Sequence, residues 1–590
     1  MFERLRPLKP YLRRYWKSLV WGGVSTILYN VIKVLLPAVI GHAVDDMQHG
    51  ITQQKILFHG LRLLLIAALS AIFLYITRQV IIGASREIEF DLRNDLFSNL
   101  ERQAPVFYHT HRTGDIMART TNDLNAVRQL LGPAIMYSAN TLVFMAAALP
   151  FMYRISPKLT FFAFVPMPAA SVIVQYFGSR IHRRFERIQA MFSDISAKAQ
   201  ENFSGARLIR AFAQEEAEIA SFEAANVEYI ERSLHLVRLM AMLWPTLEFV
   251  LGLSLMITLL VGGHEVVAHR ISVGQFTAFN VYMVQLTWPL IAVGWVINLF
   301  QRGTASMVRI DELLKQQPAI ADDPTLLQTN TPTAEAHDHP LTGEIEFRNL
   351  NFAYENCPVV LHDINLRIPA GSSLAIVGPT GSGKSTLVNL IPRLQDAPPG
   401  TVLIDNRPIR TFPLQTLRKN IGFVPQETFL FSDTIRHNIS FGTPDATPEQ
   451  IEQAATIAHI ATEILEFPRG FDTLVGERGV TLSGGQKQRT SIARAVIRNP
   501  SILILDDALA SVDTYTEERI LSGLREVMEG RTTIFISHRI STARNADQIA
   551  VLVAGRIAEL GTHDELLARN GYYTSLFEKQ RLEEELSVAT

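Results

Sequence analysis

A glycine-rich loop with a lysine and two hydroxyl residues is the part of this sequence best suited to chemistry. It reads GPTGSGKST at 378–386, between an apolar strand-like segment and a segment with helical pattern. Such a loop points backbone N–H groups at phosphate oxygens, and a following helix adds the positive end of its dipole. We expect Lys384 to reach the terminal phosphates and Ser385 to coordinate Mg²⁺. The predicted nucleotide contacts are Gly378, Pro379, Thr380, Gly381, Ser382, Gly383, Lys384, Ser385 and Thr386.

Three other segments offer side chains to the same site. The apolar strand SILILDD (501–507) brings Asp506 to its C-terminal end, where α/β sheets bind ligands. Gln426, in FVPQE, is a candidate ligand of the metal or of its water, and His538 follows the apolar segment TTIFIS. We expect His538 to reach the terminal phosphate. The sequence therefore predicts ATP and Mg²⁺ as cofactors, with the metal ligands Ser385, Gln426 and Asp506.

A structural role stays open for two of the candidate residues. Tyr354, in FAY before the loop, is placed to stack on adenine, but it also fits an ordinary strand tyrosine. A lone histidine such as His538 is more often structural. Its combination with the loop and the acidic strand end favours a role in catalysis.

The first half of the chain is much more apolar than the second. The chain has 590 residues, too many for one core, of which 47% are hydrophobic and 19% charged. Apolar runs concentrate between residues 19 and 300, and crossing a bilayer core takes about 20 apolar residues. We expect six membrane spans, near 19–44, 57–82, 130–153, 157–178, 240–266 and 273–300.

Basic residues indicate which loops face the cytoplasm. The long stretches 83–129 and 179–239 are polar and rich in arginine, with four arginines between 180 and 187. Six basic residues lie between positions 4 and 17. By the positive-inside rule, both termini and both long loops are expected in the cytoplasm, with the protein in the cytoplasmic membrane.

The domain layout follows from these patterns. We expect an α-helical six-span transmembrane domain followed by an α/β P-loop nucleotide-binding domain. The expected parts are an amphipathic segment 1–17, a membrane domain 18–314, a linker 315–343, the nucleotide-binding domain 344–580 and a tail 581–590. A net charge of −2 gives no sign of a nucleic-acid partner, and the single cysteine, Cys357, excludes an internal disulfide.

Polar residues inside the spans allow two interpretations, a functional role or a solvated position at the membrane edge. Ionisable groups in a membrane are candidates for function because their burial is costly. Arg78 lies near the end of the second span, where a wet location at the membrane edge is favoured. For Lys33, and for Glu248 three residues after Pro245, function and a wet location are equally open.

The segment LSGGQKQR at 482–489 resembles the signature of ATP-binding-cassette (ABC) transporters. The resemblance extends to a Q-loop at Gln426, GERG at 476–479, a D-loop SVD at 511–513 and a switch histidine at His538. In that family two cassettes dimerise head to tail. The resemblance thus implies that Ser483, Gly484, Gly485 and Gln486 contact an ATP held by the phosphate loop of a partner.

Six spans followed by one cassette resemble the type IV exporters, which include the lipid A flippase and multidrug and peptide exporters. Residues 108–123 and 201–215 resemble the two intracellular loops of those proteins. The resemblance implies ATP-driven export or flipping of an amphipathic or lipid-like compound, drug or peptide across a lipid bilayer. An ATP-gated channel and an importer are less compatible, because the chain has no regulatory insertion and fuses both domains.

Asp507 departs from the family pattern, which usually has a glutamate that polarises the attacking water. Aspartate is one methylene shorter, and a misplacement of roughly 1 Å can lower a rate about 100-fold. We expect tight ATP binding with slow hydrolysis. Heterodimeric exporters of the family often have one weakened site, on a subunit that lacks the glutamate but keeps a good signature, so the resemblance favours a heterodimer over a homodimer. The retained His538 and Asp513 argue for some remaining activity. An alternative is a regulatory subunit whose partner carries out most hydrolysis.

Overall fold

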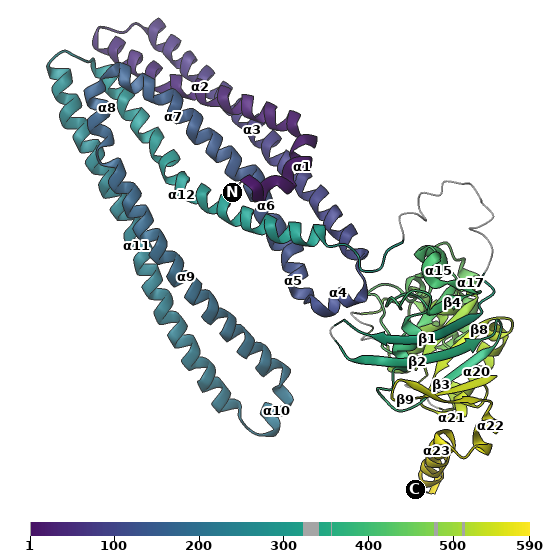
Figure 1. The fold of residues 1–590 in the computed structure, drawn as a ribbon. Coiled ribbons are helices and arrows are strands. Elements are labelled where there is room, and N and C mark those ends of the chain that lie inside the picture. Colours follow the sequence, from purple (N-terminus) through teal and green to yellow (C-terminus); the bar gives the residue numbers. More distant parts are fainter. Residues whose placement is uncertain are drawn as a thin grey trace, which may run out of the picture. The chain divides into compact units, whose positions relative to one another are not determined.

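The chain divides into two compact units in the computed structural model (Figure 1), which describes residues 2–322, 341–355, 357–476, 479, 482–509 and 514–589. The first unit comprises Met1–Glu101 with Thr113–Gln316, and the second comprises Arg102–Arg112 with Gln317–Thr590. Most of the predicted linker, the centre of GERG and the SVD segment lie outside the described residues.

The first unit is helical throughout its described elements. Helices of the predicted spans continue into the polar stretches, so that α3, α9 and α11 are much longer than a membrane crossing requires. The elements are η1 (Phe2–Leu8), α1 (Lys9–Arg14), α2 (Trp16–Gln48), α3 (Gln53–Glu101), α5 (Thr113–Ala118), η2 (Arg119–Asp123), α6 (Leu124–Gln129), η3 (Leu130–Ala134), α7 (Ile135–Ile155), α8 (Pro157–Phe164), α9 (Met167–Ser204), α10 (Ala206–Ala211), α11 (Glu215–Val267) and α12 (Val273–Lys315).

Five helical stretches of the described chain are long and apolar enough to cross a membrane. The fourth predicted span, 157–178, is divided between α8 and α9. The break falls at Val165 and Pro166, because a proline removes a backbone donor and clashes with the preceding turn. The count of six spans therefore stays a prediction. The stretches are Trp16–Gln48, Gln53–Glu101, Thr113–Ile155, Glu215–Val267 and Val273–Lys315.

Helices α2 and α12 approach each other closely at a pair of glycines. A Cβ atom on Gly274 would lie 2.0 Å from the carbonyl oxygen of Gly41. Beside this contact, Asp45 accepts hydrogen bonds from the Ser272 hydroxyl (2.6 Å) and the Gly274 N–H (2.7 Å). The start of α12 is thus fixed to the end of α2 by backbone packing and by one carboxylate.

Replacing Gly274 with alanine is expected to destabilise the protein, because the new methyl group overlaps the Gly41 backbone. Overpacking of this kind costs about 1–3 kcal/mol. Thermal unfolding of the purified full chain in detergent measures the effect. Gly263→Ala in α11 is the control, since no neighbouring atom of the described residues lies within 4 Å of its Cβ position. Equal unfolding temperatures for the two variants would contradict the close packing.

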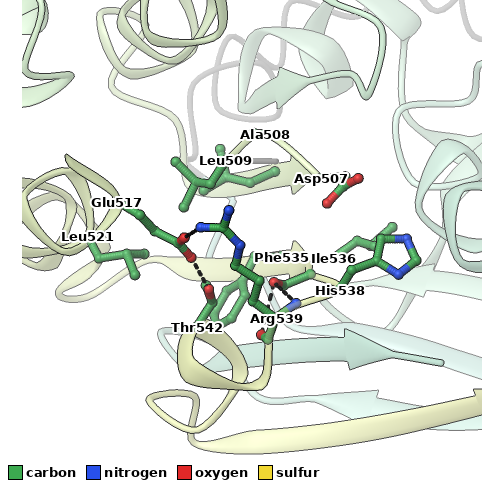
Figure 2. A pocket seen from close by; sticks show the side chains of 12 residues that line it. Asp507, Ala508, Leu509, Glu517, Leu521, Phe535, Ile536, His538, Arg539 and Thr542 are labelled. Carbon is green, nitrogen blue, oxygen red and sulfur yellow. Dashed lines mark hydrogen bonds and ion pairs between the residues drawn. The ribbon is translucent and has the colours of Figure 1, made fainter. Parts of the chain in front are cut away.

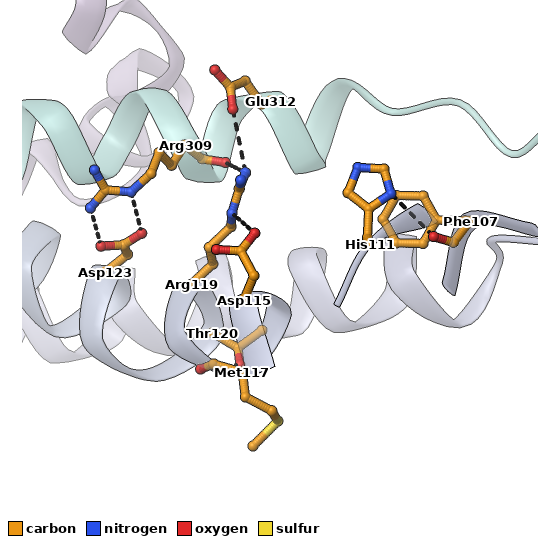
Figure 3. Close-up of polar contacts among 9 residues, drawn as sticks. All are labelled: Phe107, His111, Asp115, Met117, Arg119, Thr120, Asp123, Arg309 and Glu312. Carbon is orange, nitrogen blue, oxygen red and sulfur yellow. Dashed lines mark hydrogen bonds and ion pairs between the residues drawn. The ribbon is translucent and has the colours of Figure 1, made fainter. Parts of the chain in front are cut away.

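The last turns of α12 are held to the 113–123 region by charged side chains (Figure 3). Arg309 donates from Nε to Asp123 (2.8 Å), and the Ser306 hydroxyl donates to the same carboxylate (2.9 Å). Arg119 donates to Asp115 (2.9 Å) and to the carbonyl oxygen of Arg309 (3.1 Å). Burial alone would raise the pKa of Asp123, but the Arg309 and Ser306 hydrogen bonds outweigh it and hold that pKa below its ordinary value.

The second unit contains two β-sheets. A four-stranded sheet has the order β2-β1-β4-β5, and a six-stranded sheet has the order β10-β9-β3-β8-β7-β6. Strands β9, β3, β8, β7 and β6 run parallel, whereas β10 is antiparallel to β9. The strands are β1 (Ile345–Ala353), β2 (Val359–Ile368), β3 (Ser373–Val377), β4 (Val402–Ile404), β5 (Arg407–Pro408), β6 (Ile421–Val424), β7 (Ile502–Asp506), β8 (Thr532–Ile536), β9 (Gln548–Val553) and β10 (Arg556–Gly561).

Apolar clusters cover both faces of the six-stranded sheet. Every residue of β7 and β8 is buried, and alternate residues enter different clusters, Ile502 and Ile504 on one side and Leu503 and Leu505 on the other. This burial explains the apolar runs 502–505 and 534–536 in the two strands. The α/β prediction is confirmed.

The described helices of the second unit connect its strands, apart from α4, α22 and α23, which lie before β1 or after β10 in the sequence. Helix α4 comes from the 83–129 stretch of the sequence, yet it belongs to this unit. The helices are α4 (Pro105–Thr110), α14 (Lys384–Asn389), η4 (Ile409–Thr411), α15 (Leu414–Lys419), α16 (Ile435–Ser440), α17 (Pro448–Ile457), α18 (Ala461–Glu466), η5 (Gly470–Asp472), α19 (Gly484–Val496), α20 (Thr514–Met528), α21 (Ile540–Ala543), α22 (His563–Ala568) and α23 (Tyr572–Ala589).

Candidate ATP-binding site

The predicted catalytic residues follow neighbouring parallel strands of the six-stranded sheet. The glycine-rich loop follows β3, His538 lies two residues after β8, Asp507 lies directly after β7, and Gln426 lies two residues after β6. Because the strands are parallel, these positions share the carboxyl edge of the sheet, the usual ligand edge of such folds. The topology therefore gathers residues that lie more than 150 positions apart in the sequence.

The phosphate loop has a backbone that only glycine accommodates at its first position. Gly378 has φ +148°, and a Cβ there would lie 2.1 Å from the carbonyl oxygen of Leu552. The Lys384 ammonium is buried and donates to the carbonyl oxygens of Gly378 (2.9 Å) and Pro379 (2.8 Å). The buried Ser382 hydroxyl has no hydrogen-bond partner in the described residues. A phosphate oxygen would supply the partner that this hydroxyl lacks.

Ser385 and Asp506 lie together as a magnesium site requires. The Ser385 hydroxyl donates to the Asp506 carboxylate at 3.1 Å. Hydroxyl and carboxylate oxygens, with phosphate oxygens and water, are the ligands that Mg²⁺ prefers, so the residues present fit a magnesium nucleotide. Gln426 is exposed and forms no hydrogen bond or ion pair to the described residues. Its predicted role as a metal ligand stays a prediction.

Burial changes the acid–base properties of two charged groups at the site. It raises the pKa of the Asp506 carboxyl, and the adjacent Asp507 adds to that increase. It lowers the pKa of the Lys384 ammonium, although both aspartates oppose the change. A bound metal ion and phosphates would stabilise the ionised forms of these groups. The site therefore suits a ligand that carries both a cation and anionic phosphates.

Asp507 and His538 line one cavity of about 190 Å³ at the sheet edge (Figure 2). Asp507 has a left-handed backbone conformation, with φ +49°, and its N–H donates to the carbonyl oxygen of Ile536 (3.2 Å). This bond ties the residue after β7 to the end of β8. The short Asp507 side chain thus starts from a fixed backbone position, and reaching further requires either movement or a longer residue.

A hydrogen-bond network that holds the segment carrying His538 was not predicted from the sequence. Glu517 of α20 is buried and accepts hydrogen bonds from Arg539 and Thr542 (Figure 2). Gln580 of α23 donates to the carbonyl oxygen of His538 and accepts from the Ile540 N–H (2.8 Å). These contacts position the segment that carries His538. Glu517 and Gln580 belong to separate helices, so no local motif could reveal them.

Tyr354 lies beside the helix that follows the phosphate loop. Its hydroxyl is 3.0 Å from the Thr386 hydroxyl, and its ring meets Phe352 edge to face at 5.2 Å between centroids. The ring is therefore close to the phosphate loop. Stacking on adenine stays a prediction.

The signature residues form the N-terminus of α19. Ser483 caps this helix: its hydroxyl oxygen accepts from the Gln486 N–H (3.2 Å), and the Gln486 side chain accepts from the Ser483 N–H (2.9 Å). Gln486 and the buried Arg489 both donate to Glu463 of α18, at 2.9 and 3.0 Å. Burial alone would raise the pKa of Glu463, but these hydrogen bonds outweigh it and hold that pKa below its ordinary value.

The signature has an outward-facing part. Ser483 and Gly484 are exposed, and the described residues show no hydrogen bond from 482–486 to the phosphate loop. Among the described residues, the N–H groups of Gly484 and Gly485 at the start of this helix of 13 residues are thus available to a ligand outside the chain.

Comparisons with known proteins agree with the two-unit architecture. Residues 19–290 match the model of the ABC transporter transmembrane region, and residues 361–510 match the ABC transporter model. The chain is 37% identical to a probable multidrug resistance ABC transporter ATP-binding/permease protein, YheI, of Bacillus subtilis, covering 99% of this chain and 98% of that protein.

Two further similarities cover nearly the whole chain. An ATP-dependent lipid A-core flippase of Syntrophus aciditrophicus is 35% identical over 99% of this chain and 95% of its own length. The solved structure of a bacterial Atm1-family ABC exporter with ATP bound superposes with a TM-score of 0.76 at 29% identity, covering 96% of this chain and 98% of that chain. Exporters of this fold generally dimerise. The chain belongs to the ABC transporter family, as an ATP-driven exporter half-transporter with a membrane-embedded helical unit and an ATP-binding unit.

Proposed function

We propose that this chain is one half of a dimer that exports or flips an amphipathic or lipid-like compound, drug or peptide across the cytoplasmic membrane. Both termini and the ATP-binding unit would lie in the cytoplasm. The observation that carries the proposal is the arrangement of Lys384, Ser385 and Asp506 beside the Asp507–His538 cavity. The described part of the same chain contains five helical stretches of membrane length.

Each site residue has a proposed part in ATP use. Lys384 and the loop N–H groups hold the phosphates, Tyr354 holds the adenine, and Ser385, Asp506 and Gln426 hold Mg²⁺, which supplies charge neutralisation on the phosphates. Asp507 orients the attacking water, and His538 contacts the terminal phosphate. Ser483, Gly484, Gly485 and Gln486 contact the nucleotide held by the partner.

Asp507 supports an unequal pair of sites. Its backbone is fixed to β8, so its carboxylate stands short of the position that a glutamate would reach. The signature LSGGQ is complete, and Ser483 caps the helix that begins there. The signature can therefore contact ATP at a stronger site held by another chain. We propose a heterodimer in which the partner carries out most hydrolysis, with a homodimer as the alternative. Mass spectrometry of the tagged chain purified from native membranes separates these two, by finding either a second half-exporter or this chain alone.

The transport proposal is tested with the purified complex in proteoliposomes. Hydrolysis of external ATP should drive uptake of a fluorescent amphiphile, and the uptake should stop when EDTA removes Mg²⁺ or when a non-hydrolysable ATP analogue replaces ATP. Uptake that persists without ATP hydrolysis would contradict an exporter and favour an ATP-gated channel.

A further inference from the structure

A cavity of about 610 Å³ lies within the membrane unit, between α2, α3, α7 and α12. Its wall is mainly apolar and aromatic, and it includes the rings of Tyr29, Tyr137, Phe144, Trp288 and Trp295. A volume of this size falls in the range of small-molecule sites. The cavity is therefore large enough for much of an amphipathic molecule.

Among the described residues that line this cavity, two are basic and none is acidic. Lys33 of α2 and Arg78 of α3 are among its lining residues, whereas Glu248 is not. The Lys33 ammonium lies 5.5 Å from the Tyr29 ring centroid and 5.3 Å from that of Phe144. Neither cation forms an ion pair within the described part of the chain. The cavity thus has a positive charge without a counter-ion.

The acidic residues of the predicted spans do not neutralise this charge within the chain. Only Glu248 and Glu265 occur in those spans. Glu265, near the end of α11, is paired with Lys158 (3.2 Å) and Arg270 (2.7 Å). Glu248 is exposed on α11, forms no ion pair with the described residues and does not line the cavity, so it offers the cavity no counter-charge. An unneutralised cation at membrane depth is costly, and such residues mark ligand paths.

The cavity wall also contains polar atoms that lack partners. The Thr77 hydroxyl and the side-chain carbonyl oxygen of Gln285 are buried and make no hydrogen bond in the described residues. Thr77 is 2% exposed, so bulk water does not satisfy its hydroxyl. Lys33, Arg78 and Thr77 thus place three hydrogen-bond-donating side chains in one mainly apolar cavity. Convergent donors of this kind suit a ligand with several acceptor oxygens.

We propose that this cavity binds the anionic headgroup of an amphipathic substrate, such as a phosphate or sulfate ester with an alkyl or aromatic body. Lys33 and Arg78 bind the charged oxygens, Thr77 donates to one of them, and the aromatic side chains contact the apolar body. The proposal rests on the proposed export function and names the substrate class for it. It gives Arg78 a binding role where its sequence position favoured a wet membrane edge.

The test compares three dodecyl amphiphiles on the purified complex in phosphatidylcholine nanodiscs: dodecyl phosphate, dodecyltrimethylammonium and dodecyl maltoside. The readout is the concentration that half-maximally changes ATP hydrolysis. Hydrogen bonds between charged groups are stronger than those between neutral groups, and only dodecyl phosphate can form them with Lys33 and Arg78. Dodecyl phosphate should therefore act at about tenfold lower concentration than the other two. Equal concentrations for all three would overturn the proposal.

Variants of the cavity residues test whether the cavity causes the preference for dodecyl phosphate. Lys33→Ala and Arg78→Ala should each remove it, Lys33→Arg should keep it, and Lys33→Glu should shift it towards the cationic amphiphile. Arg62→Ala is the matched control, because Arg62 is a cation of the same helix α3 that lies over Phe58 and outside the cavity. A preference that survives Lys33→Ala and Arg78→Ala would also overturn the proposal.

Phosphatidylglycerol nanodiscs identify the source of the anion. If the substrate is an anionic lipid, phosphatidylglycerol should compete and raise the effective concentration of dodecyl phosphate. An unchanged value supports a free amphipathic anion. Failure of the export function would give a different result. No amphiphile would then be transported in an ATP-dependent way in proteoliposomes, whatever its charge.

Discussion

Replacing Lys384 with alanine is expected to weaken binding of magnesium ATP to this chain by about 10- to 100-fold, the worth of charge-assisted hydrogen bonds to phosphate. The ammonium is buried and held by the Gly378 and Pro379 carbonyl oxygens, so it stands in place before the nucleotide arrives. Equilibrium binding of a fluorescent ATP analogue to the purified full chain measures the loss.

Lys419→Ala is the control for this prediction, because Lys419 is an exposed lysine at the end of α15. Affinity should also fall as the pH rises. Burial lowers the pKa of the Lys384 ammonium below its ordinary value, so the protonated form that binds phosphate is lost earlier than it would be for a free lysine. An affinity unchanged in Lys384→Ala would show that the loop does not hold the phosphates as proposed.

Replacing Asp507 with glutamate is expected to raise ATP hydrolysis by the purified complex, by up to about 100-fold at this site, because a misplacement of roughly 1 Å has that effect on a rate. The added methylene extends the carboxylate from a backbone that is fixed by the bond between its N–H and Ile536. Phosphate release at saturating magnesium ATP measures the change.

The neighbouring aspartate offers a matched control. Asp506→Glu adds the same methylene to a buried carboxylate that contacts Ser385, so it should crowd the metal position and give no increase in hydrolysis. Equal increases in both variants would show a general effect of longer side chains. A decrease in Asp507→Glu would indicate that the site is built for the shorter acid.

Much of the ATP site could be predicted because its residues follow strands with clear local patterns. The glycine loop, the LDD strand end and His538 each come after an apolar segment, and parallel pairing brings those segments to one edge. Glu517 and Gln580 could not be predicted in this way. Their contacts with the His538 segment depend on where α20 and α23 pack, which is set by tertiary structure.

The membrane unit was less predictable for a physical reason. Apolar composition indicates that a helix crosses the membrane but not which side it turns to its neighbours, since lipid and protein interior are both apolar. Lys33 and Arg78 therefore gave no sign of sharing a cavity. The approach of Gly41 to Gly274 likewise depends on how two helices pack.

The central claim is that the ATP site on this chain is the weaker one of an unequal pair, and Asp507→Asn tests it most directly. The variant removes the charge of Asp507 and keeps its size. ATP hydrolysis by the complex purified from native membranes should stay close to the wild-type rate, because the partner's site performs most turnover. Loss of hydrolysis in Asp507→Asn would contradict the claim and establish Asp507 as a working base.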